Sequence, residues 1–344
     1  MKFCIIGCGN IAKKHLHSIN SLPDSSCVGI SDIDEGTLNK SSTEWGIPGF
    51  TDCNKMIEST NPDVAVILTS SGSHSQIVHK IAPIVKRIIV EKPISLRLDD
   101  AKDMIELCNT TKTKLTVVKQ NRFNVPVIAI KEIIDQKLFG NIFLGSIRMR
   151  WSRSQSYYDS TPWRGTWKHD GGALANQGIH FVDMIQWLMG DIESVFGKSI
   201  NAVLDIEAED TLVTSVKFKS GALATFEITT ATRPRDIEGS ISILGTKGSA
   251  SLGGFAMNEL DYLETECGIN LQTHEKRKKN TEEFAYAHKQ FYKAYIDSSH
   301  PQHHYLADGK DALKSISIIH AIYQSIEEDR EIKMDQMKFS RLGS

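Results

Sequence analysis

The sequence predicts an α/β protein of two domains, in which a doubly wound parallel sheet precedes an α+β domain built on a mostly antiparallel sheet. Its 344 residues exceed the usual size of a single domain. Through residue 120, short apolar runs alternate with helical patterns, which is typical of parallel strands buried on both faces. Later runs alternate apolar and polar residues between short turns, which indicates antiparallel hairpins. We therefore predict domains at residues 1–120 and 121–344.

The composition is that of an ordinary globular protein and excludes several functional classes. Hydrophobic residues make up 40% and charged residues 24% of the chain. A net charge of −2 provides no field that would gather nucleic acid or an anionic membrane surface. The chain starts directly in a strand pattern, without a signal-peptide layout. Its six cysteines form no CxxC pair and no zinc-type spacing with histidine, so we expect a cytoplasmic protein without a metal site.

Five short apolar runs predict the parallel strands of the first domain. These runs cover residues 2–6, 27–31, 63–68, 87–90 and 115–118. The loops after the first, third and fourth strands are 7–12, 69–74 and 91–93. Because parallel strands end at the same edge of a sheet, these loops line one crevice, and ligands of such sheets bind there.

The first of these loops carries a dinucleotide-binding pattern. It reads GCGNIA, a GxGxxA motif between a strand and a helix, where free N–H groups and the helix dipole favour a pyrophosphate. Asp32 ends the next strand, at the spacing expected of a carboxylate that binds the adenosine ribose. Since no cation is placed for a 2′-phosphate, we predict NAD rather than NADP. The alternative is a tight strand–helix turn in some other α/β protein. We expect the cofactor at Gly7, Gly9, Asn10, Ile11, Asp32, Thr69, Ser70, His74, Glu91, Lys92 and Gln120.

Lys92 follows a buried strand inside the same crevice and is the candidate catalytic base. Partial burial and a cationic nicotinamide would both lower the pKa of its ammonium group, which suits proton exchange with a hydroxyl. Hydride transfer needs little else than a carbon held against the nicotinamide and a group that takes the proton. The alternative interpretation is a surface lysine before a proline that starts a helix.

Residues 151–188 hold the densest chemistry of the second domain. The loop at 151–167 is rich in tryptophan, tyrosine and arginine, and a helical pattern follows Gly171 and Gly172. Along that helix Asn176, His180 and Asp183 have the i, i+4 and i+7 spacing of one helical face. A polar stripe on a buried helix is costly unless its groups are paired or used, so we predict a site in which His180 shares the proton transfer. The alternative is a packed surface loop and a core histidine.

Further patterns complete the second domain. Strands are predicted at 142–151, 211–218, 223–230 and 237–244, and helices at 125–137, 281–298 and 308–327. The basic run at 275–279 is interpreted as a solvated loop.

Taken in this order, the GxGxxA turn, the Glu91-Lys92-Pro93 motif and the GGALxNxGxH helix resemble the glucose–fructose oxidoreductase, inositol dehydrogenase and rhizopine catabolism family. The resemblance implies a Rossmann domain, a C-terminal domain with a large open sheet, and NAD(P)-linked oxidation or reduction of sugars. It also implies that Lys92 and His180 are catalytic, and that dimers or tetramers form through the open sheet. Most members carry an aspartate where this chain has Asn176, which implies that this amide positions substrate while Lys92 and His180 move the proton.

The segments at 117–124 and 153–190 are similar to a narrower group, the bacterial UDP-N-acetylglucosaminuronate 3-dehydrogenases of surface-polysaccharide (O-antigen) pathways. This similarity implies a UDP-sugar substrate and oxidation of its 3-hydroxyl. Guanidinium groups suit the carboxylate and diphosphate of such a substrate, because they bind both in a bidentate manner. We expect substrate contacts from Asn121, Arg122, Arg153, Gln155, Tyr157, Arg164, Asn176 and His180.

Two other functions stay open at the level of sequence. A dehydrogenase of free sugars or inositols would need fewer cations in the 151–167 loop. A non-catalytic sensor of cofactor and sugar would not need to keep both Lys92 and His180. Whether NADH leaves after each cycle, or is reoxidised in place by a 2-keto acid, is also open.

Overall fold

The computed structural model describes residues 1–270 and 284–344, which form two compact units. The first unit comprises Met1–Phe123 and Glu283–Leu313, and the second comprises Asn124–Glu282 and Lys314–Ser344. The sequence placed the boundary at residue 120 and did not anticipate that a later segment returns to the first unit. The basic run at 275–279 and the start of the helix expected from 281 lie outside the described residues. No helix in the described part of the chain is both long enough and apolar enough to cross a membrane.

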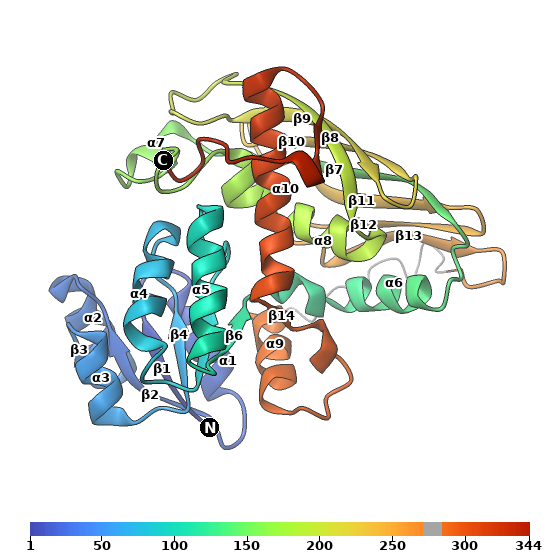
Figure 1. Ribbon diagram of the computed structural model, residues 1–344. Helices are drawn as coiled ribbons and strands as arrows, with labels where there is room; N and C mark the ends of the chain where they lie inside the picture. The colour runs from blue at the N-terminus through green and yellow to red at the C-terminus, as the bar shows by residue number, and fades with distance from the viewer. Residues whose placement is uncertain (271–283) are drawn as a thin grey trace. The chain divides into compact units, whose positions relative to one another are not determined.

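The first unit is built on a seven-stranded sheet with helices along it (Figure 1). Its strand order is β14-β6-β5-β4-β1-β2-β3, with parallel pairing everywhere except between β14 and β6. The strands are β1 (Lys2–Ile6), β2 (Ser26–Ser31), β3 (Gly49–Phe50), β4 (Val64–Ile67), β5 (Arg87–Val90), β6 (Lys114–Val117) and β14 (Ala307–Asp308). The helices are α1 (Ala12–Asn20), α2 (Glu35–Trp45), α3 (Cys53–Thr60), α4 (His74–Ile81), α5 (Leu98–Thr110) and α9 (Tyr286–Ile296). The order reverses between β1 and β4, which is where such sheets bind dinucleotides.

The segment that returns to the first unit is tied to η2 (Gln120–Phe123), the 3₁₀ turn after β6. The guanidinium of Arg122 is buried and donates to Asp311 Oδ2 at 2.5 Å and to the carbonyl oxygen of Tyr305 at 3.5 Å. The Phe123 ring packs edge-on against Phe291 of α9, with ring centroids 5.8 Å apart. A buried cation needs a partner of this kind, so Arg122 is part of the framework that closes the unit.

The second unit contains an eight-stranded sheet in the order β13-β12-β11-β7-β10-β9-β8-β15. All its neighbours are antiparallel except β7 and β10, which are parallel. The strands are β7 (Ile142–Arg150), β8 (Ile192–Ile200), β9 (Thr211–Phe218), β10 (Leu223–Thr229), β11 (Glu238–Gly245), β12 (Gly248–Gly253), β13 (Glu259–Thr265) and β15 (Ile332–Lys333). The predicted fold class, a doubly wound parallel sheet followed by a mostly antiparallel sheet, is confirmed.

Helices cover one face of this second sheet. They are α6 (Val125–Asp135), α8 (Ile179–Met189) and the second-unit part of α10 (Gly309–Glu328). The short helix α7 (Gln155–Asp159) lies in the loop after β7. Met189 and Ile185 of α8 lie so close to Gly145 of β7 that a Cβ at this glycine would be 2.4 Å from the Met189 sulfur. Ile322 of α10 approaches Gly197 of β8 in the same way. The small residues therefore let both helices dock closely on the sheet.

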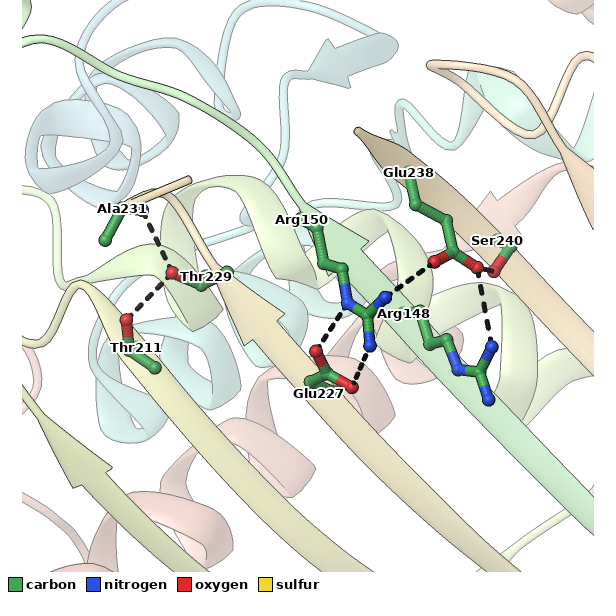
Figure 2. Close-up of polar contacts among 8 residues, drawn as sticks. All are labelled: Arg148, Arg150, Thr211, Glu227, Thr229, Ala231, Glu238 and Ser240. Atoms are coloured by element: carbon green, nitrogen blue, oxygen red, sulfur yellow. Dashed lines mark hydrogen bonds and ion pairs between the residues drawn. The ribbon is translucent and has the colours of Figure 1, made fainter. Parts of the chain in front are cut away.

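The other face of the sheet carries a ladder of charges (Figure 2). Arg150 of β7 donates to both oxygens of Glu227 on β10, at 2.5 and 2.9 Å, and to Glu238 on β11 at 3.3 Å. Arg148, two residues earlier, lies 3.9 Å from the other oxygen of Glu238. These side chains are partly exposed, so water weakens each ion pair and each contributes little to the stability of the fold. The opposite charges on neighbouring strands favour the observed order of β11, β7 and β10.

A buried carboxylate supports the start of the helix expected to carry the site. Glu209 Oε1 accepts hydrogen bonds from the Leu174 N–H at 2.9 Å and the Tyr323 hydroxyl at 3.1 Å. Glu209 Oε2 has no hydrogen-bond partner among the described residues. It faces Gly172, where an added Cβ would be only 1.9 Å away, which explains the glycine. Burial raises the pKa of Glu209 to about 7, because the ionised carboxyl loses its hydration inside the protein.

The raised pKa of Glu209 predicts a pH-dependent stability. Between pH 4.5 and about 7 the unfolded chain ionises this carboxyl while the folded chain keeps its proton, so stability falls as pH rises and is lowest above pH 7. The difference amounts to about 3 kcal/mol, at ~1.4 kcal/mol per pKa unit. Glu209→Gln should therefore raise Tm at pH 8 and flatten the decline between pH 5 and 8, measured by thermal denaturation.

The exposed Glu207→Gln, two residues away, is the control for this measurement and should keep the wild-type pH dependence. If Glu209→Gln declines with pH as steeply as the wild type, another group is responsible.

Candidate active site

The glycine turn after β1 has the backbone that the motif requires. Gly7 has φ of +100°, and a Cβ there would lie 2.8 Å from the backbone of both Leu68 and Thr69, so only glycine allows these two loops to approach. A Cβ at Gly9 would meet no atom within 4 Å, so the turn is open to a ligand on that side. Asn10 is exposed and Ile11 half-buried ahead of α1. The free N–H groups of such a helix start bind anions.

Asp32 lies directly after β2 and is tied to the glycine turn. Its Oδ2 accepts from the Cys8 N–H at 2.8 Å, and its Oδ1 accepts from the Asp34 N–H at 2.9 Å. The carboxylate is half-buried, so its oxygens can still accept from a diol. The structure thus joins Asp32 to the GxGxxA turn, and its contact with the adenosine ribose stays a prediction.

The loop after β4 presents hydroxyl groups, while its histidine is turned inward. Thr69 is half-buried and Ser70 exposed. His74 is fully buried, with Nδ1 2.9 Å from the carbonyl oxygen of Pro93 and Nε2 3.1 Å from that of Thr69. Burial lowers the pKa of His74. Its ring thus connects the loops that contain Thr69 and Pro93 and is not exposed to a ligand. The sequence had grouped His74 with the residues that contact the cofactor.

Glu91 of the Glu91-Lys92-Pro93 motif also points into the unit. Its Oε1 lies 2.9 Å from Nε2 of His15 on α1, and its Oε2 accepts from the N–H of Lys92 at 2.9 Å. Burial alone would raise its pKa, but the hydrogen bond with His15 lowers it to about 2. The carboxylate thus fixes the backbone beneath Lys92, whose side chain is half-buried.

His15, Glu91 and His288 of α9 form the one group of possible metal ligands found among the described residues. Their ligand atoms lie within 4.8 Å of one another. Nδ1 of His15 is 2.8 Å from the Tyr292 hydroxyl, so hydrogen bonds already occupy both its ring nitrogens. Burial lowers the pKa of His288 to about 3, which keeps that ring neutral. The group joins α1, α9 and the end of β5.

The η2 turn contains three of the expected contact residues in different settings. Gln120 is half-buried, and its Oε1 is covered by protein and has no hydrogen-bond partner in the described chain. Asn121 is 8% exposed. The Arg122 guanidinium is 2% exposed and paired with Asp311, so it serves the fold.

The helix expected to carry Asn176 and His180 starts with a π-type turn, η3 (Leu174–Gly178), before α8 begins. Such turns contain one more residue than an α-turn and often occur at functional sites. Asn176 and His180 are half-buried. Asp183 is buried and accepts from Ser315 Oγ of α10 at 2.9 Å. The third residue of the expected polar stripe is therefore paired within the core.

The sequence did not single out the acidic partner of Asn176. Asp170 is buried, and its Oδ1 accepts from Asn176 Nδ2 at 2.6 Å. Its Oδ2 accepts from the Gly165 N–H at 2.8 Å, so one carboxylate joins the aromatic loop to the π-turn. Its position directly before Gly171 was visible in the sequence, but no spacing rule connects a loop residue to an amide six residues later.

In the loop at 151–167, Arg164 is stacked and only partly paired. Its guanidinium carbon lies 4.2 Å from the ring centroid of Tyr157 and 5.2 Å from that of Trp163. One terminal nitrogen donates to the Tyr157 carbonyl oxygen at 2.9 Å and to Ser160 Oγ at 2.5 Å. Its Nε is buried and has no hydrogen-bond partner among the described residues. The guanidinium as a whole is half-buried, and such groups suit anionic ligands because they bind carboxylates and phosphates in a bidentate manner.

Arg153 and Gln155 are more fully engaged within the loop. Arg153 donates to the carbonyl oxygen of Ser152 at 2.7 Å and to Gln177 Oε1 at 3.3 Å, and lies 3.5 Å from Asp236. Gln155 bridges to the backbone of Asp205 through both ends of its amide, at 3.1 and 2.9 Å. Both side chains hold the loop in shape.

Each unit thus presents one part of the predicted chemistry. The first unit gathers the glycine turn, Asp32, the Thr69–Ser70 hydroxyls and Lys92 along the carboxyl edge of its sheet. The second unit gathers Arg164, Tyr157, Asn176 and Asp170 around the start of α8. An anion-binding helix start, a diol acceptor and a proton-exchanging lysine are what a dinucleotide-dependent oxidation of a hydroxyl needs.

Comparison with known proteins agrees with these features. Residues 1–119 match the model of the Gfo/Idh/MocA oxidoreductase family for its NAD-binding Rossmann fold, and residues 131–334 match the model for its C-terminal alpha/beta domain. Among characterised relatives, the chain is 25% identical to a myo-inositol 2-dehydrogenase of Thermotoga maritima, over 98% of this chain and 99% of that protein. A D-apiose dehydrogenase of Paraburkholderia graminis is 22% identical, over 98% and 90% of the two chains.

Two solved structures are more similar in sequence. The WlbA dehydrogenase of Bordetella pertussis, crystallised with NADH and UDP-GlcNAcA, is 32% identical with a TM-score of 0.88, over 97% of both chains. The WlbA dehydrogenase of Chromobacterium violaceum, in complex with the same two molecules, is 33% identical with a TM-score of 0.86, over 97% of this chain and 95% of that one. The chain therefore belongs to the Gfo/Idh/MocA family of oxidoreductases, with an NAD-binding Rossmann domain and a C-terminal alpha/beta domain.

Proposed function

We propose that this protein oxidises the 3-hydroxyl of UDP-N-acetylglucosaminuronate to the 3-keto sugar with NAD, in the cytoplasmic synthesis of a surface polysaccharide. The observation that carries the proposal is Arg164, a half-buried guanidinium stacked on the Tyr157 ring in a loop rich in aromatic side chains. A nucleotide uronate offers a carboxylate, a diphosphate and a planar base, and these are the groups that guanidinium and aromatic rings bind. Similarity to the two WlbA dehydrogenases supports the same substrate class.

The proposal gives Lys92 and His180 the proton chemistry. Bound NAD would supply the hydride acceptor. Lys92 is assigned the exchange of the proton of the sugar hydroxyl, because its backbone is held by Glu91 and the residue is half-buried at the carboxyl edge of the sheet. His180 is half-buried one residue into α8, on a helix packed against the sheet. Asn176 is an amide and cannot take the proton, so it positions substrate.

A second candidate is a dehydrogenase of inositols or free sugars, as the characterised relatives are named. It does not require the Arg164 environment, since such substrates carry no anion. The nicotinamide absorbance at 340 nm separates the two candidates when UDP-N-acetylglucosaminuronate, UDP-N-acetylglucosamine, myo-inositol and D-apiose are each added with NAD, with and without a 2-keto acid. Turnover of only the last two sugars would overturn the nucleotide-sugar proposal.

We also propose that the second sheet pairs with a further copy of the chain, in a dimer or tetramer. Beside the charge ladder of Figure 2, the same face exposes Leu144 and Leu223, which are cross-strand partners. Val213 and Phe196 on β9 and β8 are also exposed. Apolar side chains beside self-complementary charges suit a symmetric contact. Light scattering distinguishes a monomer from these assemblies.

The cofactor prediction concerns Asp32. Its carboxylate should bind the ribose diol and repel a 2′-phosphate, so the wild type should bind NAD much more tightly than NADP. Asp32→Ala should weaken NAD binding and reduce the difference between the affinities for NAD and NADP. Calorimetric titration with both cofactors measures this difference. The exposed Glu35→Gln should change neither affinity. Equal affinities in the wild type would contradict this role.

The catalytic prediction concerns turnover. Lys92→Ala and His180→Ala should each lower kcat by roughly 10²- to 10⁴-fold, the usual contribution of a general acid–base group. Asn176→Ala should lower it less. Lys86→Ala removes an exposed lysine of the same unit and should leave turnover unchanged. Losses below about tenfold in both catalytic variants would show that other groups move the proton.

The substrate prediction concerns Arg164. A hydrogen bond to a charged group is worth roughly 1.5–3 kcal/mol, so Arg164→Ala should lower kcat/KM for the uronate by about 10- to 150-fold. Arg164→Lys should recover part of the loss. Arg153→Ala should mainly lower Tm, because this side chain bonds within the loop and to Gln177. If Arg164→Ala lowers Tm and affects the uronate and UDP-N-acetylglucosamine alike, the arginine has only a structural role.

A further inference from the structure

An exposed phenylalanine lies flat on a buried tryptophan directly after β7, and we call these two residues, Phe255 and Trp151, the aromatic platform. The Phe255 ring is 55% exposed and stacks on the Trp151 ring, with centroids 4.2 Å apart and an angle of 13° between the planes. Trp151 is 5% exposed and packs edge-on against Phe181 of α8, at 5.7 Å. Trp151 thus covers one face of the Phe255 ring, and the exposed surface of Phe255 lies away from Trp151.

The turn between β12 and β13 holds Phe255 in this position. Gly254 has φ of +77°, and a Cβ there would lie 2.4 Å from Asn258 Oδ1, so the turn needs glycine directly before Phe255. Asn124 Nδ2 donates to the carbonyl oxygen of Ala256 at 2.7 Å, directly after Phe255. Because both neighbours of Phe255 are fixed in this way, its ring is a rigid apolar surface that is already ordered before a ligand binds.

The aromatic platform is continuous with the segment that carries the candidate catalytic residues. The guanidinium carbon of Arg153 lies 5.3 Å and 5.9 Å from the two ring centroids of the platform. The same guanidinium donates to Gln177 Oε1 at 3.3 Å, and Gln177 directly follows Asn176 in η3. Phe181, which contacts the platform, directly follows His180 in α8. The platform therefore lies beside the start of α8, within the second unit.

We propose that the aromatic platform binds the uracil base of the nucleotide sugar, with the base stacked on the exposed face of Phe255. The inference rests on the proposed function, because it assigns a base to the substrate. A base stacks on an aromatic ring through its flat π-face, and a nearby guanidinium such as that of Arg153 adds to the attraction. The reacting carbon must lie near His180, and the platform reaches α8 through Trp151, so Phe255 suits the end of the substrate that does not react.

The test measures the affinity for UDP, which contains the base but no sugar to be oxidised. Phe255→Ala should weaken UDP binding by roughly 5- to 150-fold, the usual effect of removing one aromatic ring from a base-stacking site. Phe255→Trp should keep the affinity within about threefold, because an indole also presents a flat face. Phe143→Ala removes an exposed ring near the other end of β7 and should leave UDP binding unchanged. Calorimetric titration measures the affinities, and melting curves show that each variant is folded.

Turnover provides a second measurement. Phe255→Ala should raise KM for UDP-N-acetylglucosaminuronate while kcat changes less than about threefold, because the base is bound equally in the ground state and in the transition state. The affinity of Phe255→Ala for NAD should equal that of the wild type, since the dinucleotide is assigned to the first unit. This difference between the two nucleotides separates base stacking in the second unit from a general loss of structure.

Several outcomes overturn the proposal. If Phe255→Ala binds UDP within about twofold of the wild type, the base binds elsewhere. Weaker binding of the uronate with unchanged UDP binding would assign the platform to the sugar ring. A changed oligomeric state with unchanged UDP binding would assign it to a second copy of the chain, and a loss of NAD affinity would assign it to the cofactor.

The two proposals can fail separately. If UDP binding depends on Phe255 but no UDP-sugar is oxidised, the proposed function fails and the platform is retained as a base-binding site. If the wild type oxidises UDP-N-acetylglucosaminuronate but does not bind UDP, the proposed function holds and the platform is refuted.

Discussion

The first unit depends on one buried carboxylate, that of Glu91. It bonds to His15 of α1, lies beside His288 of α9, and accepts the N–H of Lys92 at the end of β5. A buried charge is tolerated only when hydrogen bonds replace its hydration, and the lowered pKa of Glu91 shows that they do. Because the same group holds the helix after the glycine turn and the backbone of Lys92, the cofactor loop and the candidate base form one rigid assembly.

Glu209 of the second unit is the opposite case. It is equally buried, yet it accepts only from an N–H and a hydroxyl, and its pKa rises to about 7. Both glutamates lie beneath segments with candidate catalytic residues. The contrast shows that the neighbours decide whether a buried carboxyl is ionised: a histidine beside Glu91, and Tyr323 with a helix N–H beside Glu209. The unpaired Oε2 of Glu209 is a local cost to stability close to the π-turn, and sites often contain such costs.

The sequence predicted much of the fold because the relevant signals are local. Strands of the first unit appear as apolar runs. The GxGxxA motif determines the conformation of its own turn between a strand and a helix. The long strands β7, β9, β10 and β11 were also found, whereas β8, β12 and β13 were missed because glycine and polar residues interrupt their alternation. The site was predicted less completely. Asp170 and Glu209 act through contacts made by folding, and no period along the chain points to them. Arg122 was assigned to substrate from its charge, but its partner Asp311 lies in a segment whose return to the first unit left no local trace.

That returning segment has a consequence for how the protein is made. The first unit needs Asp311 for the buried Arg122, Tyr292 for His15, and Ala307–Asp308 as the edge strand beside β6. A ribosome that has just finished residue 123 must still synthesise residues 124–313 before these partners exist. At roughly 5–20 residues per second, this takes on the order of ten to forty seconds. During that interval Arg122 of the nascent NAD-binding unit lacks its partner Asp311. The edge of β6 also lacks its neighbouring strand β14. Completion of the first unit therefore comes after most of the second unit has been synthesised, although the first unit's own sequence emerges first.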